Sequence, residues 1–251
     1  KDASLKKRIE FLGKAYTTGS NAYEHDEDTK NEIIEINKKL YEKDRSLIKI
    51  WKETRQWSLD YFSEIYKRVY TKFDRLYFES EVAEDGIKIA KDALKKGILI
   101  KSEGAIIFDG EKYGLDKRVF INNLGFPTYE AKELGLAKLE FSEFGKIDKA
   151  IHVVGPEQSS FFKITFKVEE LLDTKKFKDK QVHLAYGWVK LKEGKMSSRL
   201  GNVVEAEKLL DELKREILQS RFQKQGYSEK EKLKLAEAIA LGATKYYFLK
   251  I

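Results

Sequence analysis

The sequence predicts an α/β fold in which helices flank a parallel sheet of the nucleotide-binding type. From about residue 120 onward, short apolar runs alternate with helical patterns, an order typical of parallel sheets. The first seventy residues show helical spacing of their apolar side chains instead, and two further helical patterns follow residue 204. We therefore expect an α/β part between two helical parts.

The individual elements follow from the spacing of apolar residues and from the Gly, Pro and Asp residues that interrupt it. Gly97, for example, ends one helical pattern, and Pro127 precedes another. The predicted helices cover residues 26–43, 47–69, 81–96, 129–139, 157–172, 204–219 and 228–249. The predicted strands cover residues 98–100, 105–108, 118–121 and 149–155, and residues 182–191 predict one or two more. For the last helix we expect a buried stripe made of Ala236, Ile239, Ala240, Ala243 and Tyr247.

Composition limits the classes of function. The 251 residues suffice for one large domain or two ordinary ones, and 41% of them are hydrophobic. With 49 Lys and Arg against 42 Asp and Glu, the net charge is +7. This charge favours a polyanionic partner, although lysine-rich solubility explains it equally well.

Several chemistries are excluded or disfavoured. The chain has no cysteine, which rules out disulfides, thiolate catalysis and cysteine-bound zinc. Its three histidines lack metal-ligand spacing, so we expect no metal site formed by protein side chains. No apolar stretch approaches the roughly 20 residues of a membrane span. We expect a cytoplasmic protein with no membrane partner.

A small, basic segment, Gly-Lys-Met-Ser-Ser-Arg-Leu-Gly-Asn at 194–202, is the strongest candidate for chemistry. Lys195 and Arg199 supply positive charge, and the two serines supply hydroxyl groups. Small residues let a nucleotide approach the backbone, while cations neutralise charge as a phosphoryl bond breaks. The segment therefore suits polyphosphate, although a solvated turn has the same composition.

The segment Lys-Met-Ser-Ser-Arg at 195–199 resembles the KMSKS loop of class I aminoacyl-tRNA synthetases, and its surroundings resemble arginyl-tRNA synthetases in particular. Similar pieces occur in the same order along the chain. They are Phe-Leu-Gly-Lys-Ala-Tyr at 11–16, Gly-Phe-Pro-Thr-Tyr-Glu-Ala-Lys-Glu at 125–133 and Val-Gly-Pro-Glu-Gln at 154–158. Together the pieces cover nearly the whole chain.

The resemblance implies a division into three segments. Residues 1–117 correspond to a helical insertion with a small β element. Residues 118–203 correspond to the second half of the Rossmann-like catalytic domain, including the KMSKS-like loop. Residues 204–251 correspond to a helical bridge, the start of an all-α anticodon-binding bundle.

Tyr129 and Glu133 lie four residues apart, so they face the same side of a predicted helix. The resemblance implies that these two residues and Gln158 bind the substrate arginine. A carboxylate can accept two guanidinium N–H groups, a geometry that excludes lysine. Glu133 stands where the family usually has Asp, which leaves this end of the site in question. The alternatives are an ordinary surface pair and, for Gln158, a helix cap.

The resemblance also implies a set of ATP-binding residues. They are His183, Gly187, Val189, Lys195, Met196, Ser197 and Ser198. Lys195 is the candidate catalytic residue, since it would contact the ATP phosphates, with Mg²⁺ accompanying ATP as a substrate. Ser198 stands where many class I enzymes have a second lysine. His183 is equally well explained as an ordinary strand residue.

The implied function is that of an arginine–tRNA ligase, which acts on arginine, ATP and the tRNA for arginine. The oligomeric state is left open, a monomer included. The chain contains no His-x-Gly-His segment, so we expect the isolated chain not to charge tRNA at an enzyme-like rate. One alternative is a non-catalytic, synthetase-like module that binds nucleic acid or protein. Another is a different class I synthetase or a related nucleotidyl transferase.

Overall fold

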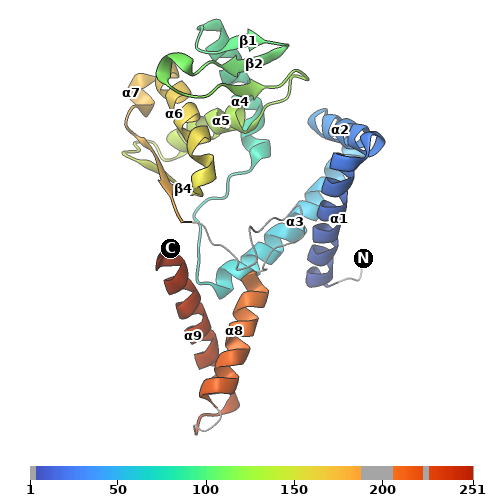
Figure 1. Cartoon of the computed structure of the whole chain (residues 1–251), viewed down its shortest axis with the longest axis vertical. Helices are drawn as coiled ribbons and strands as arrows, with labels where there is room; N and C mark the ends of the chain where they lie inside the picture. The colour runs from blue at the N-terminus through green and yellow to red at the C-terminus, as the bar shows by residue number, and fades with distance from the viewer. Residues whose placement is uncertain (1–3, 188–205, 223–225, 251) are drawn as a thin grey trace. The chain divides into compact units, whose positions relative to one another are not determined.

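The computed structural model describes residues 4–187, 206–222 and 226–250. This part of the chain forms two compact units, and Figure 1 shows the elements of both. One unit consists of the described residues up to 73 together with those from 206 onward, and we call it the helical unit. The other begins at residue 74 and is called the α/β unit.

The helical unit is built from α1 (Leu5–His25), α2 (Glu27–Tyr41), α3 (Arg45–Arg68), α8 (Ala206–Arg221) and α9 (Glu229–Lys250). Two aspartates set the boundaries between its first three helices. Asp26 has an extended backbone that ends α1, and its carboxylate accepts the Thr29 N–H at 3.3 Å to begin α2. Asp44 begins α3 in the same way, since it accepts the N–H groups of Ser46 and Leu47 at 3.0 Å. The predicted helices over 26–43 and 47–69 are confirmed.

Arg68, near the end of α3, joins that helix to α8 and α9. Its guanidinium donates to Glu237 and to Asp211, each at 2.7 Å. Lys214 of α8 also lies 2.9 Å from Glu237. Charged groups therefore fix the packing at this end of the helical unit.

The stripe predicted for α9 is only partly correct. Ala236 and Ala240 are buried as expected, but Ile239, Ala243 and Tyr247 are exposed. The buried face turns toward Leu241 instead. The reason is that α9 packs against α8, and small alanine side chains allow closer contact than Ile or Tyr.

The α/β unit contains two small sheets and the helices that pack on them. Its helices are α4 (Glu79–Lys95), α5 (Tyr129–Glu143), α6 (Ser159–Leu172) and α7 (Thr174–Phe177). Its strands are β1 (Ile100–Ser102), β2 (Ala105–Phe108), β3 (Arg118–Ile121), β4 (Ala150–Val154) and β5 (Gln181–Ala185). Strands β1, β2 and β3 form an antiparallel sheet in that order. Phe108 and Phe120 from this sheet lie in one core with Leu134 of α5 and Val168 of α6.

Strands β4 and β5 are parallel, with His152 opposite His183 and Val153 opposite Leu184. Helices α6 and α7 connect them, as expected for a parallel pair. The two faces of this pair differ in chemistry. Both histidine rings lie against Phe162 of α6, at centroid distances of 5.0 and 4.7 Å. On the other face, Ile151, Val153 and Leu184 are more than half exposed.

Most sequence predictions for this unit are confirmed, with small changes at the ends of elements. Of the one or two strands predicted over 182–191, the structure describes β5, which ends at Ala185, and residues 188–191 lie outside the described part of the chain. The short helix α7 was not predicted. The three predicted segments stay a prediction, and their boundary after residue 117 falls inside the α/β unit.

Candidate functional site

A cavity of about 570 Å³ lies in the α/β unit. Its wall comes from the start of α4, from α5, from the turn before α6 and from Arg118 of β3. The lining residues are Tyr77, Phe78, Glu79, Val82, Arg118, Tyr129, Glu130, Lys132, Glu133, Leu136, Glu157, Gln158, Phe161 and Phe162. Tyr129, Glu133 and Gln158, the three residues predicted to bind the substrate, therefore all line this cavity.

The turn before α5 fixes where Tyr129 and Glu133 lie. Gly125 has a φ of 83°, which favours glycine, and its N–H donates to the carbonyl oxygen of Asn122 at 2.9 Å. The Asn122 side chain accepts the N–H groups of Leu124 and Phe126. Thr128 then donates its hydroxyl to the Val119 carbonyl at 2.6 Å, which anchors the first turn of α5 to β3.

Tyr129 and Glu133 differ sharply in exposure, although they are one helical turn apart. Tyr129 is 69% exposed at the mouth of the cavity. The side chain of Glu133 is only 11% exposed, and its Oε1 atom is buried without a hydrogen-bond partner among the described residues. Burial, and next the negative charge of Glu140, raise the pKa of Glu133 to about 7. A buried, unpaired carboxyl group is costly unless a ligand or a proton satisfies it.

Gln158 lies at the end of a short 3-10 turn, Pro156–Gln158, immediately after β4. It is exposed, and its side chain makes no cap hydrogen bond to α6. Gln158 therefore stands at the N-cap position of α6 without capping the helix through its side chain. Its position at the carboxyl end of a parallel strand is where open α/β sheets bind ligands.

Ion pairs hold other charged side chains that line the cavity. Arg118 lies 3.2 Å from the buried Glu130, and Lys132 lies 2.5 Å from Glu79. These pairs neutralise four of the charged side chains at the cavity. Glu133, with its unpaired Oε1 atom, is not among them.

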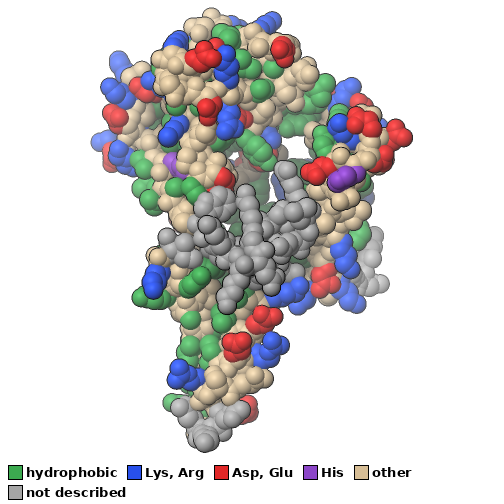
Figure 2. Space-filling view, viewed as in Figure 1, with side chains coloured by type: hydrophobic (Ala, Val, Ile, Leu, Met, Phe, Trp, Pro, Cys, Tyr) green, Lys and Arg blue, Asp and Glu red, His purple; other side chains and the backbone are tan. Residues whose placement is uncertain are grey.

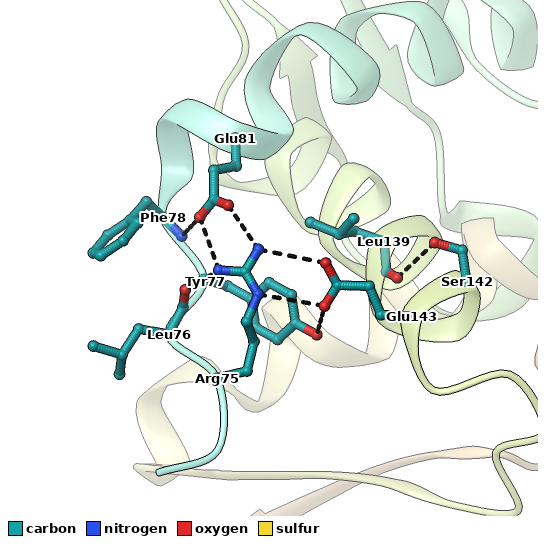
Figure 3. Close-up of polar contacts among 8 residues, drawn as sticks. All are labelled: Arg75, Leu76, Tyr77, Phe78, Glu81, Leu139, Ser142 and Glu143. Carbon is teal, nitrogen blue, oxygen red and sulfur yellow. Dashed lines mark hydrogen bonds and ion pairs between the residues drawn. The ribbon is translucent and has the colours of Figure 1, made fainter.

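A cluster of polar contacts around Arg75 positions the residues that lead into α4 (Figure 3). Arg75 donates to Glu81 of α4 at 2.7 Å and to Glu143 of α5 at 3.3 Å. Tyr77 donates to the same Glu143 at 2.8 Å, and the Phe78 N–H donates to Glu81 at 2.8 Å. The cluster therefore fixes Tyr77 and Phe78, which both line the cavity. No sequence pattern marked these residues.

Three buried or half-buried polar residues connected to Glu133 were also missed. Glu169 of α6 is 1% exposed, and its Oε2 accepts the side-chain N–H of Gln181 at 2.6 Å. The Oε1 atom of Gln181 lies 2.9 Å from Nε2 of His152, whose Nδ1 lies 3.7 Å from Oε1 of Glu133. The signal that could have found Glu169 is its spacing from Phe162 and Thr165, because all three lie on the buried face of α6.

The predicted ATP-binding residues are less fully described. His183 makes a 3.0 Å contact from Nε2 to the Val154 carbonyl and stacks near Phe162, a residue of the cavity wall. Gly187 is half-buried and follows β5, but it does not line the cavity. Val189, Lys195, Met196, Ser197 and Ser198 lie outside the described residues.

Within the described residues, no cluster of three or more His, Asp or Glu side chains is arranged to hold a metal ion. None of the described helices is long and apolar enough to cross a membrane. Figure 2 shows basic and acidic side chains interspersed on the face of the α/β unit that it draws.

Comparison with known proteins identifies the class. Residues 1–251 match the family described as tRNA synthetases class I (R), catalytic domain, so the chain belongs to the class I tRNA synthetases. Its relatives are arginine–tRNA ligases. It is 37% identical to that of Borreliella afzelii over 99% of this chain, and 35% identical to that of Porphyromonas gingivalis over 83%. The chain spans 43% and 35% of these relatives' lengths.

Solved structures agree on the fold. The chain is similar to arginyl-tRNA synthetase from Plasmodium falciparum, with a TM-score of 0.67 and 19% identity over 89% of this chain and 38% of that one. The Thermus thermophilus arginyl-tRNA synthetase gives a TM-score of 0.63 and 19% identity, over 88% of this chain and 43% of that one. The predicted fold, part of a class I synthetase, is confirmed.

Proposed function

We propose that this chain supplies the arginine-binding and ATP-binding part of an arginine–tRNA ligase. In this reaction the arginine carboxylate attacks the α-phosphorus of ATP, pyrophosphate leaves, and the arginyl group passes to tRNA. Arginine, ATP with Mg²⁺ and the tRNA for arginine are the partners in this proposal, and the cytoplasm is the location. The membership of the family and the arginine–tRNA ligase relatives support it.

The observation that carries the proposal is the unpaired carboxyl group of Glu133 in the cavity wall. A guanidinium group presents several N–H donors in one plane and carries a permanent positive charge. It can satisfy both oxygens of a carboxylate, whereas an ammonium group is a point charge. The side chain that best completes this site is therefore that of arginine.

The remaining roles follow from position. Tyr129 and Gln158 line the same cavity and have polar groups available to orient the substrate. Lys195, with Met196, Ser197 and Ser198, is proposed to hold the ATP phosphates, and His183, Gly187 and Val189 the adenine side. We keep Lys195 as the proposed catalytic residue.

Calorimetric titration of the chain with arginine, lysine and citrulline tests the proposal. Citrulline has the shape of arginine but a neutral ureido group. We expect measurable binding of arginine, and binding of lysine and citrulline weaker by at least about 30-fold, which corresponds to about 2 kcal/mol. Glu133→Gln should remove the preference for arginine over citrulline.

The matched control is Glu170→Gln. Glu170 is a glutamate of α6 that pairs with Lys167 at 3.3 Å and does not line the cavity. It should bind arginine as the parent chain does. Equal binding of arginine and citrulline by the parent chain would contradict the proposal. Binding of tRNA without any binding of arginine or ATP would instead support the non-catalytic module.

A further inference from the structure

Glu133 is the end of a row of polar side chains that runs into the α/β unit. The row consists of Glu133 on α5, His152 on β4, Gln181 on β5 and Glu169 on α6, and we call it the polar row. Its successive contacts are 3.7, 2.9 and 2.6 Å long. Glu133 and His152 are 11% and 13% exposed, and Glu169 is 1% exposed. Glu133, His152 and Glu169 are therefore nearly closed from solvent, and Gln181 is half-buried.

The direction of each hydrogen bond follows from the chemistry of the groups. The Gln181 amide donates through Nε2 to Glu169, so its Oε1 faces His152 as an acceptor. His152 must then carry its proton on Nε2. In a neutral imidazole the Nδ1 atom has a lone pair, and here it faces Oε1 of Glu133. Two acceptors facing each other repel, unless one of the two residues holds a proton.

The surroundings decide which residue holds the proton. The charged and titratable groups near Glu133 come from every packed element: Glu140 of α5, Glu169 of α6, His152 of β4, His183 of β5 and, along the cavity, Glu79, Arg118, Glu130, Lys132 and Glu157. The two cationic residues among them are paired with Glu130 and Glu79.

An ionised pair of imidazolium and carboxylate is disfavoured in this setting. Burial, then the charge of Glu140, raise the pKa of Glu133 to about 7, and burial lowers the pKa of His152. Both directions favour a neutral imidazole beside a neutral carboxylic acid. The directions agree with the geometry, in which Glu133 Oε1 is buried and unpaired.

We propose that the free site holds Glu133 as a carboxylic acid, and that a bound guanidinium group expels this proton to solvent. His152, Gln181 and Glu169 are the positioning residues, because they orient the Nδ1 lone pair toward Glu133. The inference rests on the proposed function for the identity of the cation. The proton balance is simple: carboxylic acid plus guanidinium gives the carboxylate–guanidinium pair and one released proton.

This arrangement avoids an uncompensated negative charge in the empty cavity. It also makes recognition of the cation depend on pH. Below the pKa of Glu133, binding must remove a proton, so the apparent affinity for arginine rises about tenfold per pH unit. Above it, the site is already ionised and the affinity becomes constant. A neutral ligand such as citrulline binds without releasing a proton.

The first part of the proposal, that Glu133 is a carboxylic acid in the free site, is tested on the ligand-free chain. Burial also raises the pKa of Glu140 and of Glu169, so the Glu133 signal is assigned by comparison with Glu133→Gln. In carbon-13 NMR of the glutamate carboxyl groups, a signal that titrates near pH 7 in the parent chain should be missing in this variant. Glu140→Gln should lower that midpoint by removing a negative charge, and Glu170→Gln should leave it unchanged. A Glu133 midpoint near the ordinary value of 4.5 would overturn the inference.

The positioning role has its own readout. Gln181→Leu removes the acceptor for His152 Nε2, so the ring can place its proton on Nδ1 and donate to the Glu133 carboxylate. The Glu133 midpoint should then fall. Glu169→Gln keeps an oxygen acceptor for Gln181 and should keep the midpoint well above 4.5. Equal midpoints in the parent chain and in Gln181→Leu, with a native circular dichroism spectrum, would show that the row has no positioning role.

The second part of the proposal, that a bound guanidinium group expels the proton, is tested by calorimetric titration of arginine in buffers of different ionisation enthalpy. At pH 6 we expect release of about one proton per arginine, and at pH 8 none. Citrulline should release none at either pH. If arginine did not bind, the proposed function would be overturned. The NMR midpoint would still decide whether Glu133 is protonated in the free site. Binding of arginine at pH 6 without proton release would overturn the inference and leave the proposed function intact.

Discussion

Gly86 on α4 lies directly against the main chain of Ala131 on α5, and a Cβ atom at position 86 would come within 2.2 Å of the Ala131 carbonyl oxygen. Gly135 on α5 has the reciprocal relation to α4, since its Cβ would lie 2.3 Å from the Val82 carbonyl oxygen. Neither contact can relax by rotation of a side chain, because both involve backbone atoms. The two helices therefore touch along their backbones through this glycine pair.

Replacing either glycine should separate α4 from α5. We expect Gly86→Ala and Gly135→Ala each to lower the free energy of unfolding by about 1–3 kcal/mol, because overpacking forces the backbone to move. Denaturant unfolding followed by circular dichroism measures this change. Arginine binding should weaken as well, since Tyr129 and Glu133 lie on α5.

Gly13 on α1 serves as the control. It also lies within a helix, but a Cβ there would meet nothing within 4 Å. Gly13→Ala should increase stability by up to about 1 kcal/mol through helix propensity alone. If all three substitutions stabilised the chain, the close packing of α4 on α5 would be contradicted.

Sequence patterns predicted the elements well and their environments less well. Periodicity located α4, α5 and β4 to within a few residues, because apolar spacing is a local property. It could not show that Gly86 meets Ala131, since that contact depends on how two distant helices cross. The stripe expected on α9 was rotated for the same reason: its partner α8 decided which face is buried.

The candidate site was predictable to a similar extent. Tyr129, Glu133 and Gln158 could be named from motifs, and they do share a cavity. The partners of Glu133 could not be named. Glu169 and Gln181 have polar side chains that ordinarily lie at the surface, and only the packing of α6 on the parallel strands buries them.

Burial of Glu133 should make stability depend on pH. Its folded pKa is raised above the unfolded value, so its stabilising contribution is complete below pH 4.5 and is lost as the pH rises to about 7. The rise from 4.5 to about 7 corresponds to about 3 kcal/mol. Denaturant unfolding at pH 4 and at pH 8 measures this effect. The free energy of unfolding of Glu133→Gln, relative to that of the parent chain, should be higher at pH 8 than at pH 4.

The control for this measurement is Glu170→Gln, whose stability relative to the parent chain should be nearly equal at the two pH values. A constant difference between Glu133→Gln and the parent chain from pH 4 to pH 8 would mean that the pKa of Glu133 is the same in the folded and the unfolded chain. That result would also argue against the polar row as described.

Arg68 gives a prediction for the helical unit. Arg68→Met should destabilise this unit by about 1 kcal/mol, because the contacts with Glu237 and Asp211 are half-buried. Arg68, and then Lys214, hold the pKa of Glu237 below its ordinary value. The contribution is therefore present above pH 4.5 and is lost as the pH falls further.

Thermal unfolding at low and high salt checks this prediction. The difference between Arg68→Met and the parent chain should shrink in high salt, since screening weakens the parent's ion pairs. Lys67→Met, at the exposed neighbouring position, should match the parent chain under both conditions. A destabilisation that does not change with salt would assign the effect of Arg68 to packing instead.

The Arg75 cluster can be tested by hydrogen exchange. Arg75→Met leaves Glu81 and Glu143 without their shared cation (Figure 3). The Phe78 N–H, which donates to Glu81, should exchange faster, and the cavity wall at Tyr77 and Phe78 should become less ordered. Lys72→Met, at an exposed position before the cluster, should leave the exchange rate at Phe78 unchanged. Unchanged exchange in Arg75→Met would show that Glu81 holds this segment by itself.

The parallel strands β4 and β5 place histidine and glutamine on their inner face and aliphatic side chains outside. Most sheets that are covered on one face have the opposite arrangement, with polar residues toward water. Ile151, Val153 and Leu184 therefore leave an apolar face exposed on these two strands. We expect the working concentration of a preparation to depend on these three side chains more than on the net charge of +7.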